Sequence, residues 1–165
     1  MTGPASAEWR PMAAADLAAV TAISDAVHLR YRESAATYVE RLALYPAGCR
    51  TLWAPDRRII GYLISHPWRR ADPPALDAVL GAIPGDADTY YLHDIALLPA
   101  ARGTGAGTAA TAFVAEQAAR AGFGDVTLIA VNGADSFWAA QGFLYADTGE
   151  NSPYGPGTHV MRRPL

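Results

Sequence analysis

Apolar residues recur along the chain at two spacings, one typical of helices and one of strands. In the first helical segment they return every three or four positions, as at Leu17, Val20 and Ile23, which is the pattern of an amphipathic helix. A later helical segment is followed by Gly122, a residue type that commonly ends a helix. Four helices are predicted, at residues 16–27, 34–45, 108–121 and 134–141.

The other apolar segments are short and rich in β-branched or aromatic residues, as strands are. Seven strands are predicted, at residues 8–12, 49–54, 58–66, 89–98, 125–131, 143–148 and 158–163. Pro-Asp-Arg-Arg at 55–58 indicates a hairpin, and Pro67 is expected to end the third strand. Residues 69–88 are polar and Pro-rich, with room for one helical turn. The order βααβββαβαββ predicts an α/β fold with a mixed sheet, in a single domain over residues 1–165.

Composition narrows the function by exclusion. All 13 basic residues are arginine, so the chain lacks the lysine amine of a Walker phosphate loop and of Schiff-base enzymes. The net charge of −3 and the dispersed arginines argue against nucleic acid as a partner. No apolar run approaches the ~20 residues that span a bilayer, and no leader pattern opens the chain, so we expect a cytoplasmic protein without a membrane partner. Cys49 is the single cysteine and has no neighbours at metal-ligand spacing, so it is expected to pack in the core, and no metal is expected.

Gly103, Gly105 and Gly107 lie between a predicted strand and a predicted helix. Free backbone N–H groups in such a loop, at the positive end of the helix dipole, can bind a phosphate. The simpler alternative is a turn that lets the helix pack closely on the strand. A dinucleotide-binding fold is disfavoured, although the spacing from Gly105 to Ala110 fits its fingerprint. Residues 99–102 separate the strand from the loop, and no acidic residue ends the next strand.

Three segments in the same order resemble the GNAT superfamily of acetyl-CoA-dependent N-acetyltransferases. Arg102-x-x-Gly105-x-Gly107 resembles its pyrophosphate loop, and LIAVNGADSFWAAQGF at 128–143 resembles its second motif. WRPMAAADLAAVTAI at 9–23 resembles its first strand and helix. The resemblance implies the GNAT fold, a central twisted mixed sheet flanked by helices, with acetyl-CoA as the co-substrate.

The resemblance also implies which residues hold the co-substrate. Backbone groups of Ala96, Leu97 and Leu98 would pair with the pantetheine arm, and the Leu97 N–H would stabilise the oxyanion. Asn132 would hydrogen-bond the pantetheine, and Phe137 and Trp138 would flank it. The pyrophosphate would be held by Arg102, Gly103, Thr104, Gly105, Ala106, Gly107 and Thr108.

The chemistry needs a group that can accept a proton, because an alkyl ammonium has a pKa of about 10.4. His93 titrates near neutrality and lies in YYLHDIALL, which resembles the corresponding strand of polyamine and arylalkylamine acetyltransferases. Strict alternation would put His93 with Tyr91 on one face and Asp94 on the other, unless a bulge intervenes. Asp94 is expected to orient the histidine, and a purely structural His93 is the alternative. Trp138 replaces the tyrosine that protonates the leaving thiolate in family members.

The resemblance also implies where the acceptor would bind. In this fold, the link between the first two helices and the loop between the last two strands usually form the walls of the acceptor site. The substrate-binding candidates are Tyr31, Glu33, Ser34, Tyr91 and Tyr154. Glu33 could attract a cationic amine, or could be a solvated turn residue. The predicted activity is acetyl transfer to a primary amine, expected to be a small molecule, and a homodimer is left open. The alternatives are a non-catalytic CoA sensor on the same fold, or an enzyme acting on protein N-termini or lysine.

Overall fold

A seven-stranded mixed sheet forms the centre of the computed structural model, which describes residues 6–146 and 152–165. The strands are β1 (Glu8–Pro11), β2 (Cys49–Trp53), β3 (Ile59–Trp68), β4 (Thr89–Leu97), β5 (Asp125–Ala130), β6 (Leu144–Tyr145) and β7 (His159–Pro164). Their spatial order is β1-β2-β3-β4-β5-β7-β6, and β4 with β5 is the parallel pair among otherwise antiparallel neighbours. The predicted mixed sheet is confirmed.

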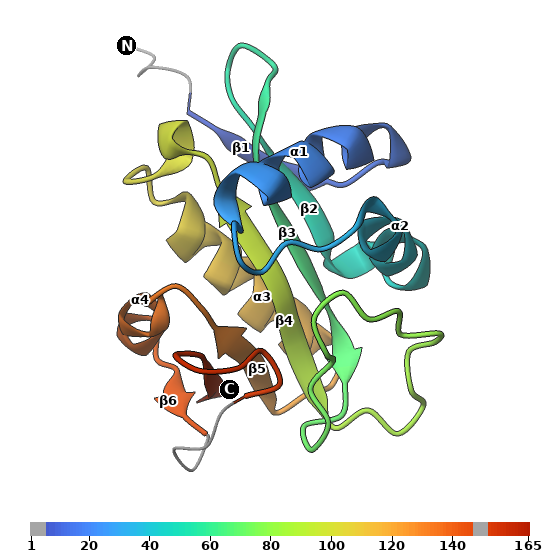
Figure 1. Ribbon diagram of the computed structural model, residues 1–165. Helices are drawn as coiled ribbons and strands as arrows, with labels where there is room; N and C mark the ends of the chain where they lie inside the picture. The colour runs from blue at the N-terminus through green and yellow to red at the C-terminus, as the bar shows by residue number, and fades with distance from the viewer. Residues whose placement is uncertain (1–5, 147–151) are drawn as a thin grey trace.

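Helices cover both faces of the sheet, as Figure 1 shows. The helices are α1 (Leu17–Val27), α2 (Ala35–Leu44), α3 (Ala106–Arg120) and α4 (Asp135–Ala140). α1 and α2 pack on one face, where Val20 and Tyr38 meet Tyr62 of β3. α3 packs on the other, where Val114 meets Leu92 of β4. α1 buries Val20 and Ile23 of the apolar stripe that its sequence pattern predicts.

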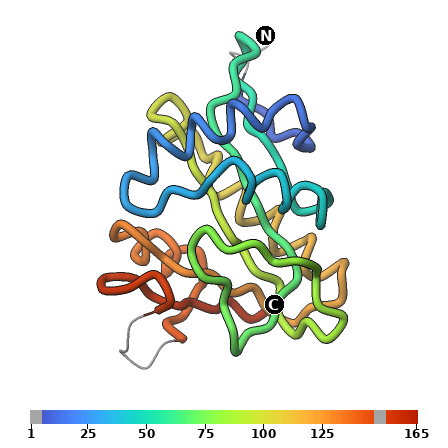
Figure 2. The backbone as a smooth tube through the Cα atoms, turned by 45° about the vertical axis from the view of Figure 1, so that its right-hand side comes forward, coloured from blue at the N-terminus to red at the C-terminus, as the bar shows by residue number. Residues whose placement is uncertain are grey.

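Two segments differ from their sequence predictions. β3 continues through Pro67 to Trp68 instead of ending at His66. The pairing of β2 with β3 stops at Ile64. From there on, β4 is the one strand paired with β3 among residues 6–146 and 152–165, so β3 tolerates a residue without an N–H. Residues 69–88 form turns without a helix and run over the α2 side of the sheet, as the tube in Figure 2 makes clear. Part of the predicted strand 143–148 lies outside the described residues.

A β-bulge in β4 sets the geometry of the centre. The register pairs Ile64 with Asp94 but Ser65 with Leu92, so His93 is an extra residue in β4. Leu92 therefore faces α3, whereas Asp94 and His93 both turn toward α1, α2 and the link between them. Strict alternation would have placed these two side chains on opposite faces, and the bulge is the exception that the sequence analysis left open.

An ion cluster ties the strands together at the end of the sheet where β4 and β5 are paired. Asp125 is fully buried and accepts hydrogen bonds from Arg70 (2.7 Å), Arg162 (2.5 Å) and Thr89 (2.7 Å). These four residues come from the segment after β3 and from β4, β5 and β7. Burial alone would raise the pKa of Asp125, but the hydrogen bonds of Arg162 and Thr89 and the charge of Arg70 hold it below its ordinary value.

We predict that Asp125→Asn lowers the free energy of unfolding by about 2 kcal/mol at pH 7, because both arginines lose a charged acceptor. The folded-state pKa of Asp125 is depressed. Its contribution is therefore present above about pH 3.9 and is lost as the pH falls through the folded value. Urea denaturation from pH 3 to pH 7 measures this. Asp56→Asn is the matched control: Asp56 pairs with Arg58 in the open, so its substitution should leave the free energy of unfolding close to the wild-type value.

Candidate active site

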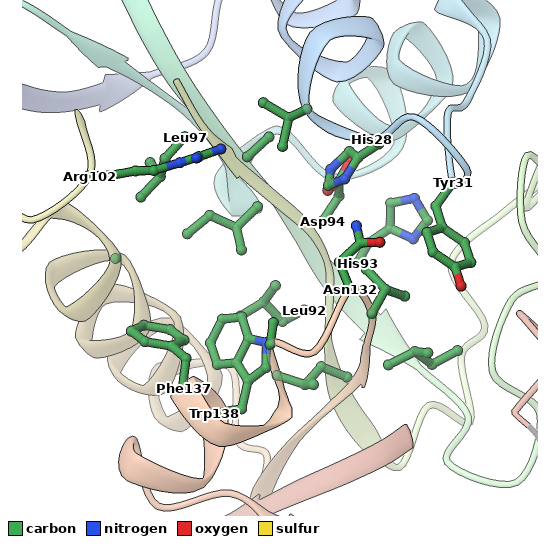
Figure 3. A pocket seen from close by; sticks show the side chains of 18 of the residues that line it. His28, Tyr31, Leu92, His93, Asp94, Leu97, Arg102, Asn132, Phe137 and Trp138 are labelled. Carbon is green, nitrogen blue, oxygen red and sulfur yellow. The ribbon is translucent and has the colours of Figure 1, made fainter. Parts of the chain in front are cut away.

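A cavity of about 610 Å³ opens where β4 and β5 separate. The two strands are paired only from Tyr90 to Leu92 of β4, and residues 93–97 have β3 as their only described neighbour. The lining comes from the end of α1 and the link after it, from β4, the glycine loop, the end of β5 and α4. Figure 3 shows these elements converging, with Arg102 at one end of the cavity and Tyr31 at the other.

The glycine loop presents free backbone donors at the start of α3. Among the described residues, no backbone N–H of residues 103–108 makes a hydrogen bond, whereas the Arg102 N–H is used by the Pro99 carbonyl. Gly103 and Gly105 have φ values of +73° and +83°, which favour glycine. The first N–H groups of a fifteen-residue helix therefore point outward with its positive dipole end. Such a cradle suits a diphosphate.

The edge of β4 supplies further backbone groups. The Leu98 N–H donates to Ile60 of β3 at 2.9 Å. Because hydrogen-bonding direction alternates along an antiparallel strand, Ala96 also faces β3, while Ile95 and Leu97 direct their N–H and C=O groups into the cavity. The Leu97 N–H, the expected oxyanion donor, therefore points into the cavity. The backbone groups of Ala96 and Leu98 point to β3, so on the other edge the groups of Ile95 and Leu97 have no strand partner among the described residues.

The wall opposite β4 is formed by the end of β5 and by α4. Asn132 adopts a left-handed conformation (φ +55°) just after β5, a geometry that asparagine tolerates. Trp138 is nearly buried and packs edge-on against Phe137 and Phe143, with ring centroids 4.9 and 5.5 Å away. A Cβ added to Gly107 would come within 3.2 Å of Phe137, so this wall approaches the start of α3 closely.

The end of the cavity opposite Arg102 is lined by two tyrosines and by a residue of the 69–88 segment. Tyr31 and Tyr154 stack with ring centroids 6.1 Å apart and an interplanar angle of 22°. Leu76 adds an apolar wall. Asp77, next to it, accepts hydrogen bonds from the Ser34 N–H and from the Thr37 hydroxyl, which fixes the segment to the start of α2.

Both carboxylate oxygens of Glu33 have a hydrogen-bond partner within the protein. Its Oε1 lies 2.6 Å from His93 Nε2, and its Oε2 accepts the Asp77 N–H at 2.8 Å. The side chains of His93 and Glu33 are 0% and 4% exposed. His66 packs beside His93, and burial, reinforced by the charge of His93, lowers the pKa of His66 to about 3. Glu33 therefore orients a histidine in this structure.

A second histidine–carboxylate pair lies beside the first. His28 Nε2 is 2.7 Å from Asp94 Oδ1, and the other Asp94 oxygen accepts from Tyr62 (2.5 Å) and Tyr38 (3.3 Å). Burial alone would raise the pKa of Asp94, but the charge and hydrogen bond of His28, the charge of His93 and the Tyr62 hydrogen bond hold it below its ordinary value. Burial alone would lower the pKa of His28, but Asp94 raises it above 6.5, helped by the charge of Glu33.

His28 was not nominated from the sequence, although its spacing carried a signal. Val20 and Ser24 of α1 and His28, the residue that caps the C-terminal end of α1, are four residues apart and buried. Most predicted site residues line the cavity together. Four do not: Leu98 packs in the core, Thr104 bonds the Ala101 carbonyl, Ser34 caps α2, and Tyr91 is buried beside His93.

Comparison with known proteins decides the family. The sequence matches the model of the acetyltransferase (GNAT) family over residues 17–143. The chain belongs to the GNAT family. No curated protein matches the sequence.

Solved GNAT structures share the fold at low sequence identity. A chain of the NatC complex bound to Gag peptide and CoA has a TM-score of 0.74 at 15% identity, with 98% of this chain and 99% of that chain covered. A GCN5-related N-acetyltransferase from Kribbella flavida has a TM-score of 0.70 at 20% identity, with 99% of this chain and 100% of that chain covered. N-acetylglutamate synthase from Neisseria gonorrhoeae, complexed with coenzyme A and N-acetyl-glutamate, has a TM-score of 0.71 at 17% identity. The match covers 99% of this chain and 36% of that chain.

The predicted family, fold and enzyme class are confirmed: this GNAT chain is an acyltransferase. Within the described residues, no group of three or more histidine, cysteine, aspartate or glutamate side chains could hold a metal ion. No helix in the described ranges is long and apolar enough to cross a membrane.

We predict that His28→Gln lowers the free energy of unfolding by about 2 kcal/mol at pH 6 and by less than about 1 kcal/mol at pH 9. The raised pKa of His28 makes its contribution fully present below pH 6.5 and lost as the pH rises through the folded value. The lowered pKa of Asp94 removes the contribution again at strongly acid pH. Denaturation of both proteins across pH 4–9 measures the difference.

An NMR titration of the histidine rings provides the control for that prediction. His28 should titrate above pH 6.5, whereas His66, with a pKa of about 3, should stay neutral at pH 6. A His28 that titrates below pH 6 would contradict the ion pair.

Proposed function

We propose that this protein transfers an acetyl group from acetyl-CoA to the primary amine of a small molecule, by direct attack in a ternary complex. One observation carries the proposal: a single cavity joins the unused amides of residues 103–108 to two histidine–carboxylate pairs at its other end. Acetyl-CoA would supply an activated acyl group whose thiol, with a pKa near 8.5, leaves readily. The CoA-bound neighbours support this choice of co-substrate.

The residues present fit a CoA ligand along the length of the cavity. The 103–108 amides and the Arg102 guanidinium would hold the diphosphate. The free edge of β4 at Ile95 and Leu97 would pair with the amide-bearing arm like an added strand, facing Asn132 and Trp138. The Leu97 N–H would then stabilise negative charge on the carbonyl oxygen.

A small amine is favoured over a protein chain by the acceptor end. The Tyr31–Tyr154 stack and Leu76 narrow it, and the segment carrying Leu76 is fixed to α2 by Asp77. The structural neighbours span both substrate kinds, since NatC is bound to a peptide and the synthase to an amino-acid product.

We predict that the protein binds acetyl-CoA by calorimetry and releases free thiol in the presence of primary amines. Arg102→Ala should weaken acetyl-CoA binding about tenfold, because one charged contact to the diphosphate is lost. Arg120→Ala is the matched control at the opposite end of α3, where Arg120 pairs with Glu116 on the surface, and its affinity should equal that of the wild type.

A second candidate is a CoA sensor, favoured by Trp138 at the position where the family resemblance expects a tyrosine acid. Acetyl-CoA binding without thiol release across an amine panel would support the sensor and reject the transferase. Absence of acetyl-CoA binding at millimolar concentration would reject both.

A further inference from the structure

We infer that Leu76 is a specificity-determining residue of the acceptor end, the end of the cavity opposite Arg102, and that Asp77 is the positioning residue that holds it there. The site then prefers a primary amine whose body is uncharged and apolar. The inference rests on the proposed acetyl transfer and names the class of amine that this transfer serves.

Leu76 reaches the acceptor end from a segment without helix or strand. Residues 69–88 form turns between β3 and β4, and Leu76 is the residue of this segment that lines the cavity. The Asp77 N–H donates to Glu33 Oε2 at 2.8 Å, and Glu33 Oε1 lies 2.6 Å from His93 Nε2. Figure 3 shows His93 at the end of the cavity away from Arg102. Leu76 therefore lies beside the groups where the amine is proposed to bind.

The Asp77 carboxylate fastens the segment to the start of α2. Its Oδ1 accepts hydrogen bonds from the Ser34 N–H (2.7 Å), the Ser34 hydroxyl (3.0 Å) and the Thr37 hydroxyl (2.8 Å). The bonds from Ser34 and Thr37 keep the pKa of Asp77 below its ordinary value, so the carboxylate is charged at neutral pH. Asp77 also has a φ of +58°, a left-handed conformation that aspartate tolerates better than most residues. Three donors on one oxygen hold this conformation and, with it, the position of Leu76.

The next turn of α2 holds the residues that follow Asp77. Glu40 accepts the Leu80 N–H at 2.6 Å, and the buried Arg41 donates to the Ala78 carbonyl at 2.9 Å. Glu40 and Arg41 follow Thr37 by one helical turn, so all three lie on one face of α2. A polar face of a helix therefore gives the segment the fixed shape that its own turns do not supply.

The surface around Leu76 suits an apolar body. Tyr31 and Tyr154, whose rings stack 6.1 Å apart, line the same cavity, and so does Val27. An alkyl or aryl group that enters this end leaves water and contacts aromatic and aliphatic side chains, which favours binding.

The charged side chains of the acceptor end already have partners. Glu33 and Asp94 each hydrogen-bond a histidine, and Arg102, the other charged residue in the described lining, lies at the opposite end. A carboxylate on the acceptor would face these two acidic groups, and a second ammonium would find both of them engaged. An unpaired charge is costly to bury, so an uncharged body is favoured.

The test is thiol release with four unbranched amines: ethylamine, hexylamine, 6-aminohexanoate and 1,6-diaminohexane. The wild-type kcat/KM should be at least about tenfold higher for hexylamine than for each of the other three. 6-Aminohexanoate and 1,6-diaminohexane keep the six-carbon chain and add one charge, so they isolate the effect of charge. Ethylamine isolates the effect of chain length.

Leu76→Ala should lower the preference for hexylamine over ethylamine about tenfold, because the shorter amine has little apolar surface for Leu76 to contact. The acetyl-CoA affinity should stay unchanged. Val79→Ala is the matched control: Val79 belongs to the same segment, is 67% exposed and does not line the cavity, so its preference should equal that of the wild type.

Asp77→Gly should raise the KM for hexylamine about tenfold, with little change in kcat or in acetyl-CoA affinity. Glycine keeps the left-handed backbone accessible and removes only the acceptor oxygen. Asp77→Asn retains such an oxygen and should keep a KM close to the wild-type value. Asp86→Gly is the control in the same segment, since Asp86 pairs with Arg69 in the open. If Asp77→Gly unfolds, as melting would reveal, Thr37→Val removes one donor instead and should raise KM in the same direction.

The inference alone is overturned by any of three results: an unchanged preference in Leu76→Ala, an unchanged KM in Asp77→Gly, or a wild type that favours either charged six-carbon amine. Acetyl-CoA binding without thiol release with any amine rejects the proposed transfer, and the inference with it.

Discussion

The divergence of β4 from β5 is the constraint on which the rest of the structure depends. Backbone groups of a central strand must find partners, and in the part of the chain that the structure describes residues 94–97 pair with β3 alone. The bulge at His93 lies where the parallel pairing stops, so one extra residue both ends the pairing and reorients the side chains that follow. The free edge that results is exposed to the cavity and can be satisfied by a ligand.

Burial around the bulge forces its charged groups into pairs. An isolated carboxylate at the positions of Glu33 or Asp94 would cost several kcal/mol, whereas each one here meets a histidine and further donors. The two carboxylates differ in their other hydrogen-bond partners. Asp94 accepts from Tyr62 of β3 and Tyr38 of α2, while Glu33 accepts from the Asp77 N–H in the 69–88 segment. One pair is tied to the sheet, and the other to the wall of the acceptor end.

The features that depend on local sequence patterns could be predicted from the sequence. Helical spacing placed α1, α2 and α3 to within two residues, and the glycine spacing located the loop before α3. Pairings across long separations were not predictable. His28 meets Asp94 across 66 residues, and His93 meets Glu33 across 60, because a bulge that has no sequence signature turns both β4 side chains to one face. Pro67 was misread for a related reason, since its tolerance depends on where β2 ends.

Trp138 illustrates how packing and chemistry share one position. Its indole is nearly buried between Phe137 and Phe143, so it stabilises the wall opposite β4, and it cannot donate a proton usefully. Expulsion of the thiolate without an acid is chemically reasonable near neutral pH, because a thiol of pKa near 8.5 is a fair leaving group. The amine is the harder partner, since its pKa of about 10.4 lies some three units above neutrality. The two histidine–carboxylate pairs therefore lie at the end of the cavity where the proposed reaction has its larger protonation demand.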